Sequence, residues 1–444
     1  MLHKKKLLAV HLNEFNLNFL RFGAKKYKCD YINKFLKYNK VKTYSVDKEQ
    51  DKNLDPWVQS VSINTGKKSK NHKIFKTGQS VPNKLIQIWD YLAKKNFKCA
   101  IWGTMNSKYK KNKNIEIFFP DPWNNQTIVK PKKLKNLYDL PRSYAQNYTD
   151  FNLFNNFKKI LKFLFVCLNL NIFFYFIKNF FLYFKILAST GIKNYLLFFL
   201  FDIISLKFFF NLTQNRNLNF SLIFLNSSAH FQHNNWDEKD NYYKYFLLNN
   251  EIFKLIFKIS EDYDEVLIYN GFTQKRINPE FIIRPINPKK FIRNIGVNYE
   301  SFNSNMTNGG IISFKNKIQR DKSLKILKKY NIYGYKIFEI KQLSKKKIFF
   351  RIQIKSFYNF NSIINKKFSK NEIIKKLSYE KSSLKIINNN INRDFDSFRS
   401  QMTFIKTTGK HIFEGNILFK NNLTKKLKIE NTNIFFIIKK YFEK

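Results

Sequence analysis

The stretch LLAVHLNEFN, residues 7–16, decides the fold class of this chain of 444 residues. Its first six residues form a short and almost continuously apolar run, which is typical of a strand buried on both faces. The run stops at the polar residues Asn13 and Glu14. In parallel sheets, functional groups gather just beyond the carboxyl ends of the strands. The stretch therefore predicts a central strand with a candidate site at its end.

The same order of signals recurs along the chain. A helical pattern at 83–96 runs into the strand-like FKCAIWG, and another at 242–260 is followed by VLIYNGF, residues 266–272. The strand-like SLIFL opens into NSSAHFQH, residues 226–233, which we expect to be a polar loop. Helices alternating with buried strands predict an α/β fold with a mostly parallel sheet flanked by helices.

Two segments depart from this rhythm and are predicted to be insertions. Residues 151–218 are aromatic and aliphatic with scattered lysines, as expected of a hydrophobic helical cap, and residues 312–400 combine helix and strand signals, as expected of a small α+β subdomain. The α/β core is then expected in three parts, at 1–150, 219–311 and 401–444.

The hydrophobic segment leaves two interpretations open. Its longest run without a charged residue, Phe163 to Ile177, holds 15 residues, whereas a membrane span needs about 20 predominantly apolar residues. A span is therefore disfavoured. The segment is either a cap on the core or an amphipathic surface that lies on anionic lipid as a peripheral membrane contact.

The composition of the chain limits the classes of molecule that it is expected to bind. The chain holds 81 Lys and Arg against 31 Asp and Glu, a formal charge of +50. The basic residues are spread over the whole length without a folded nucleic-acid-binding motif, so we expect no specific nucleic-acid partner but an attraction for anionic substrates. Three distant cysteines and a short apolar run near the start favour a cytoplasmic location, with peripheral membrane contact as an addition.

The histidines suggest a metal site. Only six occur, and three of them, His230, His233 and His411, stand in polar segments near strand ends. Neutral imidazole is a favoured zinc ligand, and a catalytic zinc needs three protein ligands and one open position. These three histidines with Glu14 would suffice.

The order of motifs resembles the alkaline phosphatase superfamily, in particular its type I phosphodiesterase and nucleotide pyrophosphatase branch and related sulfatase-like proteins. VLIYNGF falls where that family has a strand followed by Asp-His-Gly. The resemblance implies a metal-dependent hydrolase or transferase that acts on a phosphate or sulfate ester. The other segments that carry it are LLAVHLNEFN, SVSINTGKKSKNHKIF (60–75), LIFLNSSAHFQH (222–233) and TGKHIFEGNILF (408–419).

Several family positions are changed. Asn13 precedes Glu14 at the first ligand position, and Asn226 stands at the next acidic one. The family nucleophile lies nine residues before the Thr of the TG pair, where this chain has Pro56. Ser60 and Ser62 are the nearest hydroxyls and could act as nucleophiles only if the loop is rearranged.

With few carboxylates left to offset two cations, we expect at most one divalent metal per chain, zinc or manganese. The predicted ligands are Glu14, His230 and His411, with His233 as a fourth and Asn13 as a further candidate at the first ligand position. The substrate would be an anionic small-molecule or glycan ester. The alternative is a pseudoenzyme: a non-catalytic protein of the same fold that binds an anionic glycan, a lipid headgroup or a protein partner.

Overall fold

The structure is a computed structural model, and its chain divides into two compact units. The first unit comprises residues 1–276 and 409–444, and the second comprises residues 277–408. The structure describes residues 5–45, 47, 54–146, 152–169, 172–181, 183–184, 186, 194–304, 309–332, 335–352, 385–388, 391–394, 401–421 and 423–443.

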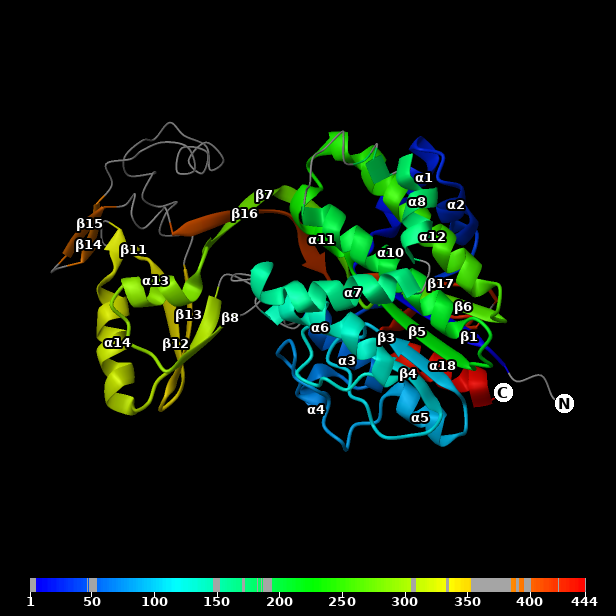
Figure 1. Ribbon diagram of the computed structural model, residues 1–444, viewed down its shortest axis with the longest axis horizontal. Coiled ribbons are helices and arrows are strands. Elements are labelled where there is room, and N and C mark those ends of the chain that lie inside the picture. The colour runs from blue at the N-terminus through cyan, green and yellow to red at the C-terminus, as the bar shows by residue number, and fades with distance from the viewer. Residues whose placement is uncertain are drawn as a thin grey trace. The chain divides into compact units, whose positions relative to one another are not determined.

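The first unit is built on a sheet of eight strands in the order β18-β2-β17-β6-β1-β5-β3-β4. Figure 1 labels six of them: β17, β6, β1, β5, β3 and β4. Seven strands run parallel and only β17 runs against its neighbours. The predicted α/β fold with a mostly parallel sheet is therefore confirmed. The strands are β1 (Leu7–Leu12), β2 (Asn39–Tyr44), β3 (Cys99–Trp102), β4 (Ile115–Phe119), β5 (Phe220–Leu225), β6 (Glu265–Tyr269), β17 (Glu414–Phe419) and β18 (Lys428–Glu430).

Helices cover both faces of this sheet, and the alternation of side chains along β1 explains why. Leu8 and Val10 point into one apolar layer, whereas Leu7 and Ala9 point into the other. Both faces are buried, so the strand reads as a continuous apolar run, as the sequence predicted. The helices of this unit outside the hydrophobic segment are α1 (Leu17–Lys26), α2 (Asp30–Leu36), α3 (Pro56–Thr65), α4 (Ser69–His72), α5 (Ile88–Lys94), α6 (Lys135–Gln146), α11 (Ser227–Asn235), α12 (Tyr242–Ser260) and α18 (Asn433–Glu443), with short 3₁₀ turns at Lys132–Leu134 and Lys239–Asn241.

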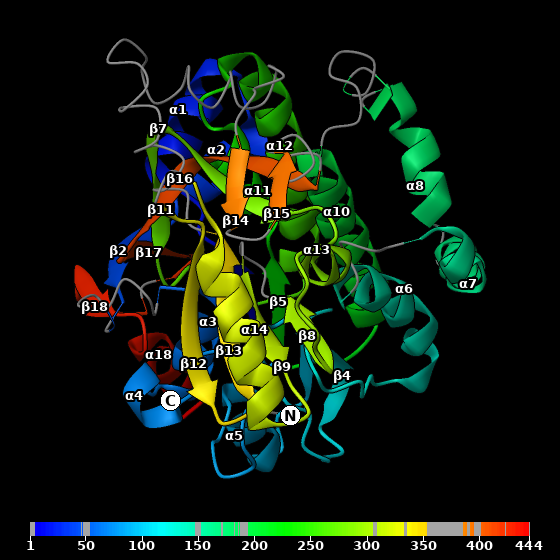
Figure 2. The same cartoon turned by 90° about the vertical axis from the view of Figure 1, so that its left-hand side faces the viewer.

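The hydrophobic segment 151–218 is helical where the structure describes it. After a 3₁₀ turn at Phe154–Asn156 it forms α7 (Phe157–Asn169), α8 (Ile172–Lys178) and α10 (Asn194–Thr213). The helix α10 packs against α11, α12 and β5 and is part of the core of the first unit. In Figure 2, α7 and α8 lie at the outer right-hand edge of the first unit.

The expected loop after β5 is wrong, because NSSAHFQH forms most of the helix α11. The carboxylate of Asp202 on α10 accepts hydrogen bonds from the backbone N–H groups of Asn226 and Ser227, at 2.9 and 2.7 Å. A carboxylate there satisfies backbone donors at the start of the helix. Because this acceptor comes from another helix, the local sequence gives no sign of it.

The second unit is a small α+β assembly. Strands β12, β13, β9 and β8 form an antiparallel sheet in that order, and α14 with α13 supplies apolar side chains to its core. Its start at residue 277 lies earlier than the predicted insertion boundary of 312. Much of the predicted 312–400 subdomain beyond residue 352 lies outside the described residues. The bounds are α13 (Pro288–Asn294), β8 (Ser301–Ser304), β9 (Gly309–Ser313), α14 (Lys317–Lys329), β10 (Asn331–Ile332), β11 (Tyr335–Lys336), β12 (Phe338–Ser344), β13 (Lys347–Ile352), β14 (Lys385–Asn388) and β15 (Ile391–Asp394).

Two long strands connect the units along the chain. β7 (Thr273–Pro285) leaves the first unit, and β16 (Met402–Ile412) returns to it. They pair as a two-stranded sheet. The return brings His411 back into the first unit, although it lies almost 400 residues after Glu14 in the sequence.

Candidate metal centre

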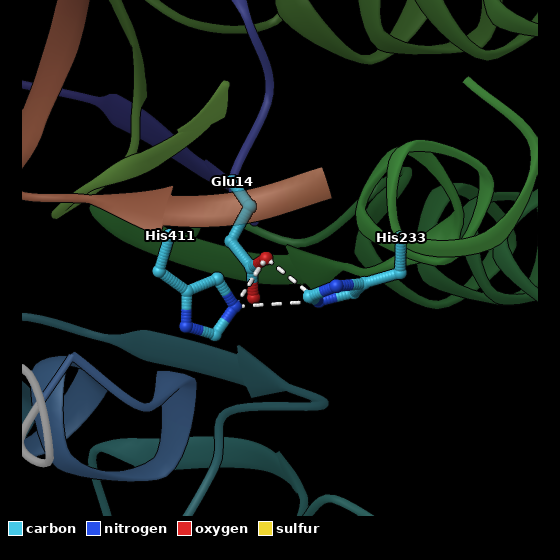
Figure 3. A group of neighbouring side chains, drawn as sticks. All are labelled: Glu14, His233 and His411. Atoms are coloured by element: carbon cyan, nitrogen blue, oxygen red, sulfur yellow. Dashed lines mark hydrogen bonds and ion pairs between the residues drawn. The ribbon is translucent and has the colours of Figure 1, made fainter. Parts of the chain in front are cut away.

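Three side chains from distant parts of the chain converge in the first unit (Figure 3). Glu14 follows β1, His233 lies on α11 and His411 lies near the end of β16. Glu14 Oε2 lies 3.1 Å from His233 Nε2 and 3.0 Å from His411 Nε2. The two Nε2 atoms lie 3.3 Å apart. Three potential ligand atoms therefore form a small and nearly equilateral triangle.

The size of this triangle fits one metal ion. Ligand atoms held about 2.0–2.1 Å from a tetrahedral zinc lie roughly 3.3–3.4 Å from one another. Two imidazoles and one carboxylate are also a donor set of catalytic zinc sites. The Glu14 side chain is only 1% exposed, whereas 32% of the His233 side chain and 23% of the His411 side chain are exposed. The triangle thus has a buried carboxylate at its base and an accessible side where a fourth ligand could bind.

The Glu14 carboxylate and the histidines beside it shift one another's pKa. Burial alone would raise the pKa of Glu14, but His411 and His233 together outweigh it and hold the pKa well below its usual range. Burial would lower the pKa of His411, and the Glu14 carboxylate overcomes this and raises it. Without metal, the residues therefore form an ion pair. A divalent cation would take the place of the histidine proton as the positive partner of the Glu14 carboxylate. Metal binding should therefore release protons.

Hydrogen bonds from surrounding residues hold the three side chains in place. Asn13 Nδ2 donates to Glu14 Oε1 at 2.9 Å, and Gln274 Nε2 donates to Glu14 Oε2 at 2.5 Å. The backbone carbonyl of Leu54 accepts a hydrogen bond from the ring of His411. Such outer contacts fix the orientation and tautomer of metal ligands.

The backbone of Glu14 is strained into position. Its φ of 54° lies in the left-handed region, which is uncommon for a residue with a side chain. The Glu14 carbonyl accepts hydrogen bonds from Gln232 Nε2 at 2.8 Å and Thr273 Oγ1 at 2.9 Å. Such strain persists only where the surroundings enforce it, and it is concentrated at functional sites.

A glycine allows β16 to pack closely against the residues that hydrogen-bond to Glu14. A Cβ atom on Gly409 would lie 2.0 Å from Gln274 Oε1 and 2.6 Å from the Gln232 carbonyl oxygen. Because Gly409 lies two residues before His411, any larger residue there would displace the strand that carries this histidine.

Asn13 and His230, two of the predicted ligands, lie outside the triangle. Asn13 Nδ2 also donates to Asn226 Oδ1 at 2.7 Å, and Asn226 Nδ2 lies 3.2 Å from His230 Nε2. The His230 ring stacks on Phe198 with 3.3 Å between centroids, and burial lowers its pKa to about 3. Asn13 Oδ1 is buried without a hydrogen-bond partner among the described residues, so it remains available to an ion or a water molecule.

Ser60 and Ser62, the candidate nucleophiles, lie inside α3 and are fully buried. Ser62 Oγ donates to the Val58 carbonyl at 3.3 Å and lies 3.0 Å from His72 Nε2. Ser60 Oγ donates to the Met105 carbonyl at 3.5 Å. A nucleophilic role for either hydroxyl would require the segment to rearrange. His72 is buried at this position as well.

Asp55 is a residue that sequence reasoning missed. It is the N-cap of α3, directly before Pro56, and its carboxyl lies close enough to His411 and Glu14 for both to influence its pKa. Burial raises that pKa to about 6, His411 lowers it and Glu14 raises it. The sequence signal was present: an acidic residue stands one place before the position of the family nucleophile.

Comparisons with known proteins come from solved structures. Scans against protein-family models and curated proteins find no match. The chain is similar to murine ectonucleotide pyrophosphatase/phosphodiesterase 5 at 8% identity and a TM-score of 0.43, with 99% of this chain and 95% of that chain covered. It is similar to the phosphonoacetate hydrolase of Sinorhizobium meliloti 1021 at 7% identity and a TM-score of 0.42, with 98% and 95% covered.

A third similar structure is the wild-type alkaline phosphatase PafA, at 10% identity and a TM-score of 0.42, with 98% of this chain and 95% of that chain covered. These likenesses concern the fold alone.

Proposed function

We propose that this protein is a hydrolase or transferase that uses a single divalent metal ion, zinc or manganese, to act on a phosphate or sulfate ester. The observation that carries the proposal is the triangle of Glu14 Oε2, His233 Nε2 and His411 Nε2, with sides of 3.0–3.3 Å. One carboxylate with two neutral imidazoles suits one divalent cation and leaves an excess positive charge that attracts an anionic ester.

The metal would polarise a phosphoryl or sulfuryl oxygen and stabilise the charge that develops there. The chain itself supplies orientation: Asn13 and Gln274 fix the Glu14 carboxylate, and Leu54 fixes the His411 ring. The exposed edges of the two histidines leave the substrate side open.

Water is the better candidate for the attacking group, because Ser60 and Ser62 are buried and already hydrogen-bonded. Asp55 supports this part of the proposal. Its carboxyl lies near His411 and Glu14, and burial raises its pKa, so it is placed to accept a proton from an attacking water as a general base.

The alternative, a non-catalytic protein that binds an anionic glycan, a lipid headgroup or a protein partner, also has a specific observation in its favour. The position of the family nucleophile holds Pro56, and the Glu14 carboxylate is well satisfied by hydrogen bonds within the protein. In that case the cluster would serve as an ion pair that stabilises the fold.

Elemental analysis of the purified protein tests the proposal. We expect about one zinc or manganese per chain in the wild type, and loss of that metal in Glu14→Gln, His233→Ala and His411→Ala. His230→Ala is the matched control, because His230 lies one turn from His233 on the same helix yet outside the triangle. The control should retain its metal.

Turnover is then measured on metal-loaded protein with chromogenic phosphate monoesters, phosphate diesters and sulfate esters. Hydrolysis that disappears in His411→Ala supports the catalytic proposal. Metal binding without turnover across the panel favours the binding protein. Protein that takes up no metal, even when supplied during expression, overturns the metal centre.

A further inference from the structure

The helices α7 and α8 present an unusual surface. Half of the large apolar side chains that are exposed among the described residues lie between positions 153 and 184. Phe154 and Phe181 are 91% and 83% exposed. Contiguous exposed apolar surface of this kind marks an interaction site in a soluble protein.

The exposed apolar residues follow the helical period. On α7 they occur at i, i+4, i+7, i+8 and i+11, so they form one stripe along the helix. The stripe consists of Phe157, Leu161, Leu164, Phe165 and Leu168. We call these five residues the α7 stripe.

The segment that begins with α8 repeats the pattern. Its exposed residues again lie at helical spacing, while Ile172, Tyr183 and Ile186 point into the core. Each part of the segment therefore uses one side to pack on the protein and leaves an apolar side uncovered. The exposed residues are Phe173, Phe174, Ile177, Phe180, Phe181 and Phe184.

Positive charge accompanies the α7 stripe. Lys158 and Lys162 are exposed, and they lie three residues before Leu161 and Phe165, as neighbours on the helix surface. The sequence has no acidic residue from position 151 to position 201. Lysines beside an apolar stripe can extend their ammonium groups to phosphates while their methylenes stay on apolar surface.

We propose that the α7 stripe and the adjoining exposed side of α8 dock the protein on the surface of an anionic lipid bilayer. Apolar side chains would enter the boundary between headgroups and acyl chains, and lysines would contact lipid phosphates. A second copy of the chain is a poorer occupant, because it would bring lysine-rich surfaces together without an acidic partner between positions 151 and 201.

The helices fit a surface contact better than a span. By length and composition, Tyr195–Thr213 could cross a membrane, but 56% of that window is buried within the protein, and Phe199, Ile203 and Leu206 belong to the core. Phe154–Leu168 and Ile172–Lys178 satisfy the same test only as a pair, and they are bent by 74° relative to each other.

Flotation of the full chain with vesicles tests the proposal. The wild type should float with vesicles of phosphatidylcholine and phosphatidylglycerol at physiological salt. The double variant Leu164→Gln and Phe165→Gln should bind roughly ten-fold more weakly or worse, because it removes two inserting side chains without changing the charge. Leu427→Gln is the matched control: its side chain is 85% exposed, outside the stripe, and binding should not change.

Three results would overturn the proposal. Equal binding by the wild type and both variants would mean that only the general positive charge is attracted to the vesicles. If the wild type bound vesicles of pure phosphatidylcholine as well as it binds the anionic vesicles, the lysines would have no role in binding. A dimer that dissociates in the Leu164→Gln and Phe165→Gln variant, seen by analytical ultracentrifugation together with no flotation, would identify a second copy as the occupant.

Fluorescence provides a second measurement if the double variant folds poorly. Phe165→Trp should gain emission that shifts to shorter wavelength with the anionic vesicles and is quenched by brominated lipid. Leu427→Trp should show neither change. An unchanged spectrum in Phe165→Trp would contradict docking through the α7 stripe.

Discussion

The first unit contains two histidine sites that look alike in sequence and differ in chemistry. At one, His233 and His411 direct Nε2 atoms at the buried Glu14 carboxylate, and their edges remain partly exposed. At the other, His72 is buried beside Ser62 within the segment that resembles the nucleophile side of the family. Only the first arrangement combines three potential ligand atoms with partly exposed histidine rings.

The difference lies in how the ring nitrogens are used. His72 Nδ1 accepts a hydrogen bond from the Ile74 N–H at 3.0 Å, so Nε2 carries the proton and donates to Ser62 Oγ at 3.0 Å. Both nitrogens are satisfied within a few residues. The ring of His411 donates a hydrogen bond to the Leu54 carbonyl, and its Nε2 atom is directed at Glu14. A histidine is available for metal when local contacts do not already use both of its nitrogens.

The largest expected effect concerns pH and His72. Burial lowers its pKa to about 4 from 6.5, while Asp47 raises it. The unfolded chain therefore binds more protons than the folded chain between these values, so stability is lost as pH falls from 6.5 to about 4. At about 1.4 kcal/mol per pKa unit, the contribution approaches about 3 kcal/mol.

His72→Gln should remove this component. Its free energy of unfolding, measured in urea across that pH range, should fall less steeply towards acid than that of the wild type. Lower stability near neutral pH is expected as well, because two hydrogen bonds are changed, and the difference from the wild type should shrink towards acid pH. Parallel curves for the two proteins would show that His72 is not held neutral by its site.

An intermediate effect is expected at the shell of the metal centre. Gln274→Leu removes the donor to Glu14 Oε2 and should weaken metal binding by about 10–100-fold, the usual range for an outer contact. Competition with a chelating dye measures the affinity. Gln126→Leu, which alters a glutamine that hydrogen-bonds with Tyr109, is the control and should keep the wild-type affinity. Equal affinities in both variants would mean that the carboxylate needs no such support.

These residues also indicate what the sequence can predict. The strand β1 and the position of Glu14 follow from one apolar run that ends in polar residues, because a doubly buried strand has a local signature. His411 was found because the chain has few histidines and this one stands in a segment that resembles a family motif. Gln274 and Leu54 could not be found, because their roles depend only on contacts between segments distant in the chain.

The sequence-based preference for His230 over His233 as a metal ligand has a physical origin. In a loop, both could turn to one metal. On α11 they lie three residues apart, about 4.5 Å along the helix axis, so His233 reaches Glu14 while His230 meets Asn226. The Asp202 carboxylate accepts hydrogen bonds from the backbone N–H groups at the start of α11. Asp202 is distant in the sequence, so the local sequence alone suggested a loop.

The smallest expected effect is at Lys73, the residue that follows His72. Its φ of 58° and ψ of 29° place it in the left-handed region, so the backbone keeps the conformation that glycine favours. Lys73→Gly should relieve the strain and, after the entropy cost of glycine, stabilise the protein by up to about 1 kcal/mol. Lys70→Gly, within the helix α4, should instead destabilise it by a similar amount. Thermal unfolding of the two variants tests this prediction. If both variants lower the melting temperature equally, the left-handed backbone at Lys73 holds no strain that glycine can relieve.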